Sequence, residues 1–352
     1  FSGARTITTD YDNSAGTFAL KESGRGKGVI TYDANNGTST SGASLLTNTV
    51  NTCADSGRYS YVTDAHWGAE MSYDYLMNVH GRNSIDNNGF ALISYAHWDV
   101  NWSNASWNGQ FMRYGDGNGS SKPYTCLDVC GHELAHGLTG RTARLVYAYE
   151  SGALNESFSD IFGNCIEYYN KPNATKNWLV GEDRGTPIRS MSNPNVRSSP
   201  DTYTGDYWWT SSGDNGGVHY NSGVQNHWFY LLSVGGSGTN DLGDAYSVTG
   251  ITIPKAEKIA FRNLVVYLDA DDEYEEARFY SIQAAVDLYG ACSPEVASTV
   301  NAWHAVGVGD AYVQAVAADF SVDKEFSCSI PQTFVFSNES NYYNVQTYAW
   351  DF

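Results

Sequence analysis

The chain has few basic residues: 20 Lys and Arg stand against 39 Asp and Glu, and the formal net charge is −19. Proteins bind nucleic acids and anionic membranes through clustered Lys and Arg, so we expect neither as a partner. The chain also lacks a run of roughly 20 apolar residues, which a membrane-spanning helix requires. No secretory signal stands at Phe1, so an exported form of this chain would be a processed, mature one.

Cysteine is sparse but even in number, which is compatible with disulfides in an oxidising compartment. The six residues are Cys53, Cys126, Cys130, Cys165, Cys292 and Cys328. Their pairing is not readable from the sequence. The chain of 352 residues exceeds one compact unit, so we expect two lobes or more.

The first part of the chain is predicted to be rich in strands, because alternating or β-branched stretches are broken by Asn and Gly. The expected strands are 28–32, 91–98 and 109–114, and a helix is expected from Asp64 within the segment 60–79. Around His132 the apolar residues begin to recur at helical spacing. The expected helices are 126–140, 152–169, 217–234, 254–267, 274–289 and 294–306. This order predicts an α+β fold.

The segment His132-Glu133-Leu134-Ala135-His136 is the most informative one. On a helix, residues four apart share one face, so both imidazoles can reach a single Zn²⁺. Glu133 could then take a proton from a metal-bound water, and Glu156 on a following helix would supply the third, oxygen ligand. The fourth position would be left for water.

The same pentapeptide also occurs by chance, as two hydrogen-bonded histidines and a surface Glu in an ordinary helix. The metzincin pattern of zinc proteases would need a third histidine at the position where Thr142 stands. A Glu on a second helix is therefore the better candidate for the third ligand.

Residues 132–163, HELAHGLTGRTARLVYAYESGALNESFSDIFG, resemble the active-site segment of the thermolysin family of metalloendopeptidases. Three further motifs keep the family's order: NASWNG at 104–109, RSM at 189–191 and DNGGVH at 214–219. The resemblance runs from Val62 to Val308. It implies a two-lobed fold with the zinc-binding helix between the lobes, where pockets usually form. The implied division is a β-rich lobe with that helix at 1–145, a helical lobe at 146–315 and an extension at 316–352.

The resemblance also implies the catalytic roles. Glu133 would be the general base, and Tyr147 and His219 would stabilise the oxyanion. Asp214 would orient His219, although without the family this histidine could equally mark a bend beside Gly216 and Gly217. A zinc-bound imidazole needs an acceptor on its other nitrogen. Asp160 would serve His132, and the resemblance places Asn155 at His136.

Substrate contacts follow from the same resemblance. Asn104 and the Ala105 backbone would pair with an extended peptide as an added strand. Arg189 would bind a substrate carbonyl, although a surface salt bridge is the ordinary role of such a residue. The pocket for the side chain after the scissile bond (P1′) would be lined by Val129, Val180 and Ile188, which favours Leu or Phe. Arg184 stands where the family usually has an aliphatic residue, so the pocket could be narrower or accept acidic side chains.

Calcium is the second implied metal, since Asp128, Glu167 and Glu182 match oxygen ligands of the family. Asn177 and Leu179 stand where further carboxylates would complete a two-ion site. One ion is therefore expected, with the Asn177 side chain and the Leu179 carbonyl as weaker ligands, and solvated acids are the alternative. Solubility and calcium binding suffice to explain the acidity, although adaptation to salty or cold surroundings would also fit the few basic residues.

Two expectations concern the cysteines and the tail. The resemblance places Cys130 and Cys165 on the two metal-bearing helices and implies a disulfide between them, which would leave Cys292 with Cys328 and Cys53 with Cys126. Residues 318–352 resemble the start of a polycystic-kidney-disease (PKD) β-sandwich module. A strand extension native to the peptidase is the alternative, because so short a fragment cannot build its own core.

Together these features predict a secreted, extracellular, zinc-dependent and calcium-stabilised endopeptidase that cleaves proteins and peptides at internal bonds. We expect a monomer that matures from a precursor with an inhibitory propeptide. A non-catalytic zinc-binding module would not need Glu133, Tyr147 and His219. A zinc aminopeptidase would need an acidic clamp for a free amino terminus, and we find no such motif.

Overall fold

The computed structural model describes residues 1–52, 57–119, 122–172, 176–313, 320–322 and 336–338. The chain divides into two units, Phe1–Ala311 and Tyr312–Phe352. In the second unit, β14 (Phe320–Val322) and β15 (Phe336–Asn338) form one antiparallel pair. Most of residues 318–352, on which the PKD resemblance rests, lies outside the described residues, so that resemblance stays a prediction.

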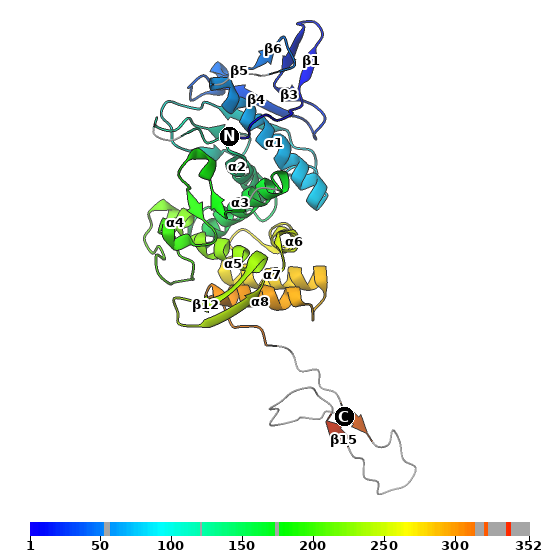
Figure 1. Ribbon diagram of the computed structural model, residues 1–352, viewed down its shortest axis with the longest axis vertical. Coiled ribbons are helices and arrows are strands. Elements are labelled where there is room, and N and C mark those ends of the chain that lie inside the picture. Colours follow the sequence, from blue (N-terminus) through cyan, green and yellow to red (C-terminus); the bar gives the residue numbers. More distant parts are fainter. Residues whose placement is uncertain (53–56, 120–121, 173–175, 314–319, 323–335, 339–352) are drawn as a thin grey trace. The chain divides into compact units, whose positions relative to one another are not determined.

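A six-stranded mixed sheet lies at one end of the larger unit (Figure 1). Its order is β3-β4-β7-β9-β8, with β5 also pairing β4, so β8 is an edge strand. β4 runs parallel to β7 and β7 runs parallel to β9, whereas the other pairs are antiparallel. The strands are β3 (Lys21–Glu22), β4 (Val29–Asp33), β5 (Ser44–Leu45), β7 (Leu92–Ala96), β8 (Ala105–Trp107) and β9 (Met112–Tyr114). The three predicted strands are thus confirmed: β4 is shifted by one residue, and β7 and β9 are shorter than predicted.

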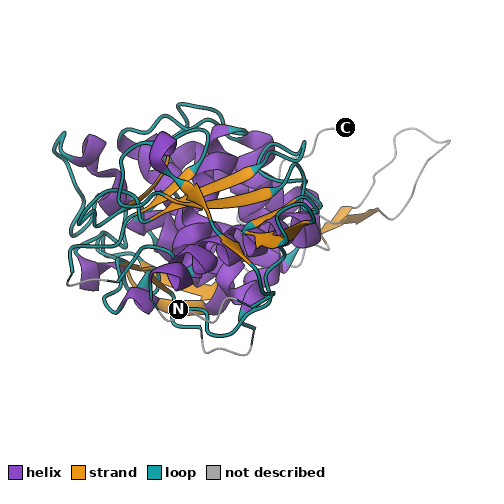
Figure 2. Ribbon diagram, turned by 90° about the horizontal axis from the view of Figure 1, so that it is seen from above, coloured by secondary structure: helices purple, strands orange, loops and turns teal. Residues whose placement is uncertain are grey.

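Smaller sheets complete the β structure of this unit. They are β1-β2-β6 (Asp10–Asp12, Thr17–Ala19, Thr47–Asn48), β10-β11 (Leu179–Val180, Arg189–Ser190) and β12-β13 (Gly235–Thr239, Ala245–Thr249). Figure 2 shows long loops joining strands and helices over the surface.

The predicted helices are present. They are α1 (Arg58–His80), α2 (Leu127–Gly140), α3 (Tyr149–Asn170), α4 (Asp214–Asn221), α5 (Gly223–Val234), α6 (Ile253–Arg262), α7 (Tyr274–Tyr289) and α8 (Pro294–Ala305). Short turns are η1 (Thr40–Gly42), η2 (Glu182–Arg184), η3 (Pro194–Arg197) and the π-helical η4 (Asn263–Tyr267). Two predictions need correction: α1 starts before Asp64, and the helix expected over 217–234 is two helices. Among the described helices, none is both long and apolar enough to cross a membrane.

α2 and α3 pack together in the middle of the larger unit. α1 packs between α2 and the sheet, while α5 and α6 pack against α3 in the helical part. There the fully buried rings of Trp228 and Trp303 stack with centroids 4.8 Å apart. This arrangement places both motif-bearing helices, α2 and α3, between the sheet and the helical layer.

The structure contradicts the predicted disulfides. Cys130 and Cys165 are buried free thiols, and they have different neighbours. Cys130 faces α1, where a Cβ added to Gly68 would lie 2.7 Å from its sulfur. Cys165 instead forms a hydrogen bond with Tyr75. Cys126 and Cys292 are free as well, and their expected partners, Cys53 and Cys328, lie outside the described residues.

Candidate active site

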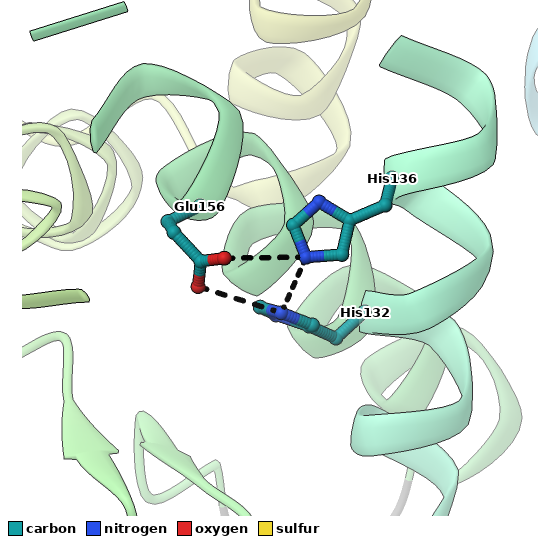
Figure 3. A group of neighbouring side chains, drawn as sticks. All are labelled: His132, His136 and Glu156. Carbon is teal, nitrogen blue, oxygen red and sulfur yellow. Dashed lines mark hydrogen bonds and ion pairs between the residues drawn. The ribbon is translucent and has the colours of Figure 1, made fainter. Parts of the chain in front are cut away.

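His132 and His136 of α2 and Glu156 of α3 converge on one point (Figure 3). The Nε2 atoms of the two histidines are 3.0 Å apart. The Glu156 carboxylate lies 3.3 Å from His136 Nε2 and 3.6 Å from His132 Nε2. The structure therefore brings together the three side chains that the helical spacing and the second motif predict as zinc ligands.

The outer nitrogens of both imidazoles face acceptors. His132 Nδ1 is 2.9 Å from Asp160 Oδ1, and His136 Nδ1 is 2.8 Å from Asn155 Oδ1. The Asn155 amide is oriented by its own Nδ2, which donates to the Leu145 carbonyl at 3.1 Å. Each Nδ1 therefore carries the proton, which leaves the lone pair on each Nε2.

This donor set fits a zinc ion. Two Nε2 lone pairs that face each other at 3.0 Å repel unless a cation lies between them. Glu156 Oε2 is also buried, and it has no hydrogen-bond partner among the described residues. Two imidazole nitrogens and one carboxylate are a typical ligand set of catalytic zinc, which keeps its fourth position open.

The charges around Glu156 and Asp160 agree with this assignment. Burial alone would raise the pKa of Glu156, but the charge of His136 and its hydrogen bond lower it well below the usual value. Burial would likewise raise the pKa of Asp160, yet Arg189 and the His132 hydrogen bond lower it. Burial would lower the pKa of His136, but Glu156 raises it to about 9, so without a metal a proton occupies His136 Nε2, and a zinc ion would replace that proton. Both carboxylates are thus held ionised beside the site.

Glu133 lies beside the three ligands, and its carboxyl is buried. Burial raises the pKa of this carboxyl, as a proton acceptor near neutral pH requires. The backbone N–H of Trp107 donates a hydrogen bond to it. Sequence reasoning missed this contact, which links the edge strand β8 directly to the predicted base.

Tyr147, just before α3, and His219 of α4 both lie next to Glu156. The Tyr147 hydroxyl donates to Glu156 Oε1 and lies 3.2 Å from His219 Nε2. Asp214 Oδ1 lies 2.6 Å from His219 Nδ1, and Asp214 Oδ2 accepts the His219 backbone N–H at 2.9 Å. The structure therefore brings Tyr147 and His219 together beside Glu156, with Asp214 held against His219.

The DNGGVH motif has an unusual backbone, which explains the break before α5. Asp214, Asn215, Gly216 and Gly217 have φ values of 53°, 52°, 90° and 82°, in the left-handed region that favours glycine. A Cβ on Gly216 would lie 2.4 Å from the Tyr149 ring, and one on Gly217 would lie 2.5 Å from Trp209. The turn brings the Asp214 carboxylate onto His219 within five residues.

Comparisons with known proteins agree with this geometry. Family models of the thermolysin metallopeptidase match the chain twice: the catalytic domain over residues 1–140 and the alpha-helical domain over 143–308. The chain belongs to the thermolysin metallopeptidase family. The family uses a catalytic zinc ion, and the three converging side chains provide a site for it.

Individual relatives point the same way. The chain is 44% identical to a thermolysin of Bacillus sp. (strain EA1) over 310 residues. This aligned region covers 86% of this chain and 55% of that protein. The chain is 41% identical over 307 residues to a bacillolysin of Bacillus cereus, covering 84% and 52%. The solved precursor of protealysin, a metalloproteinase from Serratia proteamaculans, matches with a TM-score of 0.66 at 30% identity, covering 80% of this chain and 87% of that one. The chain spans about half the length of the curated relatives it matches.

Arg189, which the thermolysin-family resemblance implies as a substrate anchor, also contacts an acceptor of the zinc site. It is buried, and its Nε and Nη2 bind Asp160 at 2.6 and 2.7 Å. Asn226 of α5 donates to the same carboxylate at 2.8 Å. Arg189 therefore holds the acceptor of a zinc ligand, in addition to any contact with a peptide. Sequence reasoning missed Asn226, because no local motif marks a contact between residues so far apart in the chain.

The predicted substrate residues form two groups, one on and beside β8 and one around Gly181. Asn104 is exposed, and Ala105 begins the edge strand β8, which can add an extended peptide. The predicted P1′ residues gather around Gly181, where an added Cβ would lie 2.8 Å from Ile188 and 3.7 Å from Val129. Val180 adjoins them in β10 and is buried.

Arg184, the departure from the family pattern, is buried beside this pocket. Its guanidinium carbon lies 3.4 Å from the ring centroid of Tyr124. Arg184 Nε has no hydrogen-bond partner within the described part of the chain. The Arg184 guanidinium is thus stabilised by a cation–π contact with the Tyr124 ring.

The predicted calcium residues also come together. Burial, together with the nearby carboxylates of Glu167 and Glu182, raises the pKa of Asp128 to about 7. However, the Asn177 amide nitrogen donates to Glu182 Oε1 at 2.7 Å, and the Leu179 carbonyl accepts an N–H from Asn164 at 2.9 Å. The residues present therefore do not fit a calcium ion in the way that the resemblance implies.

Proposed function

We propose that this chain is a zinc-dependent endopeptidase that hydrolyses internal bonds of proteins and peptides. The observation that carries the proposal is the convergence of His132, His136 and Glu156 beside the buried carboxyl of Glu133. We further propose an apolar P1′ preference, since Val129, Val180 and Ile188 are medium-sized apolar residues.

The proposed mechanism assigns a task to each side chain. A zinc ion held by the three ligands would supply Lewis acidity, which polarises the scissile carbonyl and makes water more acidic. Glu133 takes a proton from the attacking water and delivers it to the leaving amine nitrogen. The Trp107 N–H keeps the Glu133 carboxyl in place while it does so.

Tyr147 and His219 stabilise the negative charge that develops on the carbonyl oxygen. Tyr147 donates its O–H, which binds Glu156 in the structure, and His219 donates from Nε2 in its protonated form. Asp214 holds the other ring nitrogen of His219 and so aims Nε2 at the site. The peptide itself adds to β8 through Asn104 and Ala105.

We propose the following organisation for the protein. Residues 1–145 form the β-rich lobe with the zinc-binding helix, residues 146–315 form the helical lobe, and residues 316–352 form an extension. The limits of the family matches, 1–140 and 143–308, support the first two. We also propose an extracellular monomer that is released from a precursor with an inhibitory propeptide. The solved relative that is itself a precursor supports maturation of this kind.

The test is cleavage of a protein substrate with and without 1,10-phenanthroline, followed by addition of zinc. We expect the chelator to abolish cleavage and a stoichiometric amount of zinc to restore it. Mass spectrometry of the products should find internal peptide bonds cut on the amino side of Leu or Phe. Products shortened only by single amino-terminal residues would contradict an endopeptidase, and cleavage that persists without zinc would contradict the metal mechanism.

A further inference from the structure

Two lysine ammonium groups lie where the thermolysin-family resemblance would place calcium. Lys171, which follows α3, is 3.0 Å from Glu167 Oε1 and 2.9 Å from Asp183 Oδ2. Lys176 is 3.6 Å from the other oxygen of Glu167. Both lysine side chains are largely buried, with 17% and 14% of their surface exposed. These are therefore ion pairs held inside the protein rather than mobile surface contacts.

Several other oxygens of the site accept N–H donors of the chain itself. The backbone N–H groups of Val129 and Gly181 donate to Asp128. The Asn177 side chain donates to Glu182, as described above. The Lys176 ammonium also donates to the Asn164 carbonyl at 3.1 Å. Calcium takes 6–8 oxygen ligands, so an ion here would first have to displace most of these donors.

The charge balance leads to the same conclusion. Lys171 and Lys176 together carry the charge of one Ca²⁺, and they pair with Glu167, one of the carboxylates that would bind it, and with the neighbouring Asp183. Both lysines line a cavity of about 140 Å³, together with Glu167, Asn177 and Glu182. An ion that entered this cavity would meet two ammonium groups at close range. Among the described acceptors here, Glu182 Oε2 is buried without a hydrogen bond, and one oxygen does not make a calcium site.

We propose that Lys171 and Lys176 take the place of the structural calcium ion, so that this peptidase unit keeps its fold without calcium. The inference concerns stability and does not rest on the proposed catalytic activity. Its physical basis is that a cation tethered to the chain neutralises the carboxylates at any calcium concentration, whereas a bound ion does so only by mass action.

The test uses full-length protein with Glu133→Gln, saturated with zinc and freed of calcium on a chelating resin. This background removes self-digestion, so the thermal midpoint reports folding alone. We expect the same midpoint from no added calcium to millimolar calcium, and no heat of calcium binding in calorimetry. One equivalent of bound calcium, or a midpoint that rises by several degrees with calcium, would overturn the inference.

Variants of the two lysines test their role directly. In Lys171→Met with Lys176→Met, the carboxylates lose their cations, so the calcium-free midpoint should fall and added calcium should now raise it. The matched control replaces the exposed Lys21 and Lys27 by Met and should leave the midpoint and its indifference to calcium unchanged. If the double variant does not fold, Lys176→Gln provides a milder change. A lysine variant as stable as its parent without calcium would also contradict the proposal.

Discussion

Gly131 of α2 and Gly163 of α3 lie opposite each other where the two ligand-bearing helices touch. A Cβ on Gly131 would be 3.0 Å from the Gly163 Cα, and a Cβ on Gly163 would be 2.4 Å from the Asp128 carbonyl oxygen. The second distance is too short for a real side chain, and the first is tighter than most Cβ contacts in proteins. This close approach lets His132 of α2 and Glu156 of α3 share one metal ion.

Gly163→Ala should therefore push α2 and α3 apart. Overpacking of this kind costs roughly 1–3 kcal/mol of unfolding free energy, and it should also weaken zinc binding because the ligands separate. Urea unfolding and a zinc competition assay measure the two effects. Gly140→Ala is the matched control at the end of α2, where an added Cβ meets nothing within 4 Å. Equal stability and zinc affinity in both variants would show that the glycine contact does not position the site.

The sequence predicts the zinc site well because its determinants are local. Helical spacing places His132 and His136 on one face, and Asp160 follows Glu156 by one turn on α3. The family motifs locate Tyr147 and His219 in the same way. Predicting these positions requires only the helical period and the order of the motifs along the chain.

Other features depend on contacts between distant segments or on side-chain direction, which no local pattern encodes. Asn226 reaches Asp160 from α5, and Arg189 forms a bidentate pair with the same carboxylate, in addition to the substrate role predicted for it. The disulfide prediction was wrong because sharing neighbouring helices does not make Cys130 and Cys165 face each other.

Glu133→Gln should keep zinc but lose activity. The amide cannot accept the proton of the attacking water, so kcat should fall by roughly 10²–10⁴ or more. Zinc content by atomic absorption should remain near one equivalent, because Glu133 is not among the three converging ligands. Near-normal turnover at full zinc content would rule out Glu133 as the general base.

Asp160→Asn should affect both stability and zinc. Loss of the carboxylate charge leaves the buried Arg189 with only Glu156, 3.6 Å away, as an ion-pair partner, and breaking a buried pair costs roughly 3–5 kcal/mol. The neutral amide oxygen is a weaker acceptor for His132 Nδ1 than the carboxylate, so zinc affinity should fall by roughly 10–100-fold. Denaturant unfolding of the zinc-free protein isolates the first effect, and zinc competition isolates the second. An unchanged zinc affinity would show that His132 is oriented by other contacts.

His80, at the end of α1, should destabilise the fold in acid. Burial lowers the pKa of this imidazole to about 3, and its ring stacks on Phe261 at 3.8 Å. A folded-state pKa below the unfolded one means that this contribution is complete above about pH 6.5 and is lost as the pH falls toward 3. By pH 4.5 the loss should be roughly 2–3 kcal/mol at 1.36 kcal/mol per pH unit.

His80→Gln keeps a hydrogen-bonding group near Tyr75 but cannot be protonated in this range. Its unfolding free energy should therefore fall less steeply between pH 6.5 and 4.5 than that of the parent. Denaturant titrations on a Glu133→Gln background avoid self-digestion. Parallel pH curves for variant and parent would show that the imidazole does not contribute to acid sensitivity.

The last prediction concerns the tail, because the chain divides at Ala311 and Tyr312 into two units. A shortened chain that ends at Gln314 keeps all of the larger unit, including the stacked Trp228 and Trp303. It should therefore retain the thermal midpoint and the peptide-cleaving rate of the full chain. A chain that ends at Cys292 is the control: it loses α8 and the fully buried Trp303 ring, and it should not fold. Replacing Cys292 by Ser in both shortened chains removes an exposed free thiol that could otherwise cross-link them. If the chain that ends at Gln314 also unfolds, the tail belongs to the peptidase fold, and the strand extension replaces the separate module as the explanation of residues 316–352.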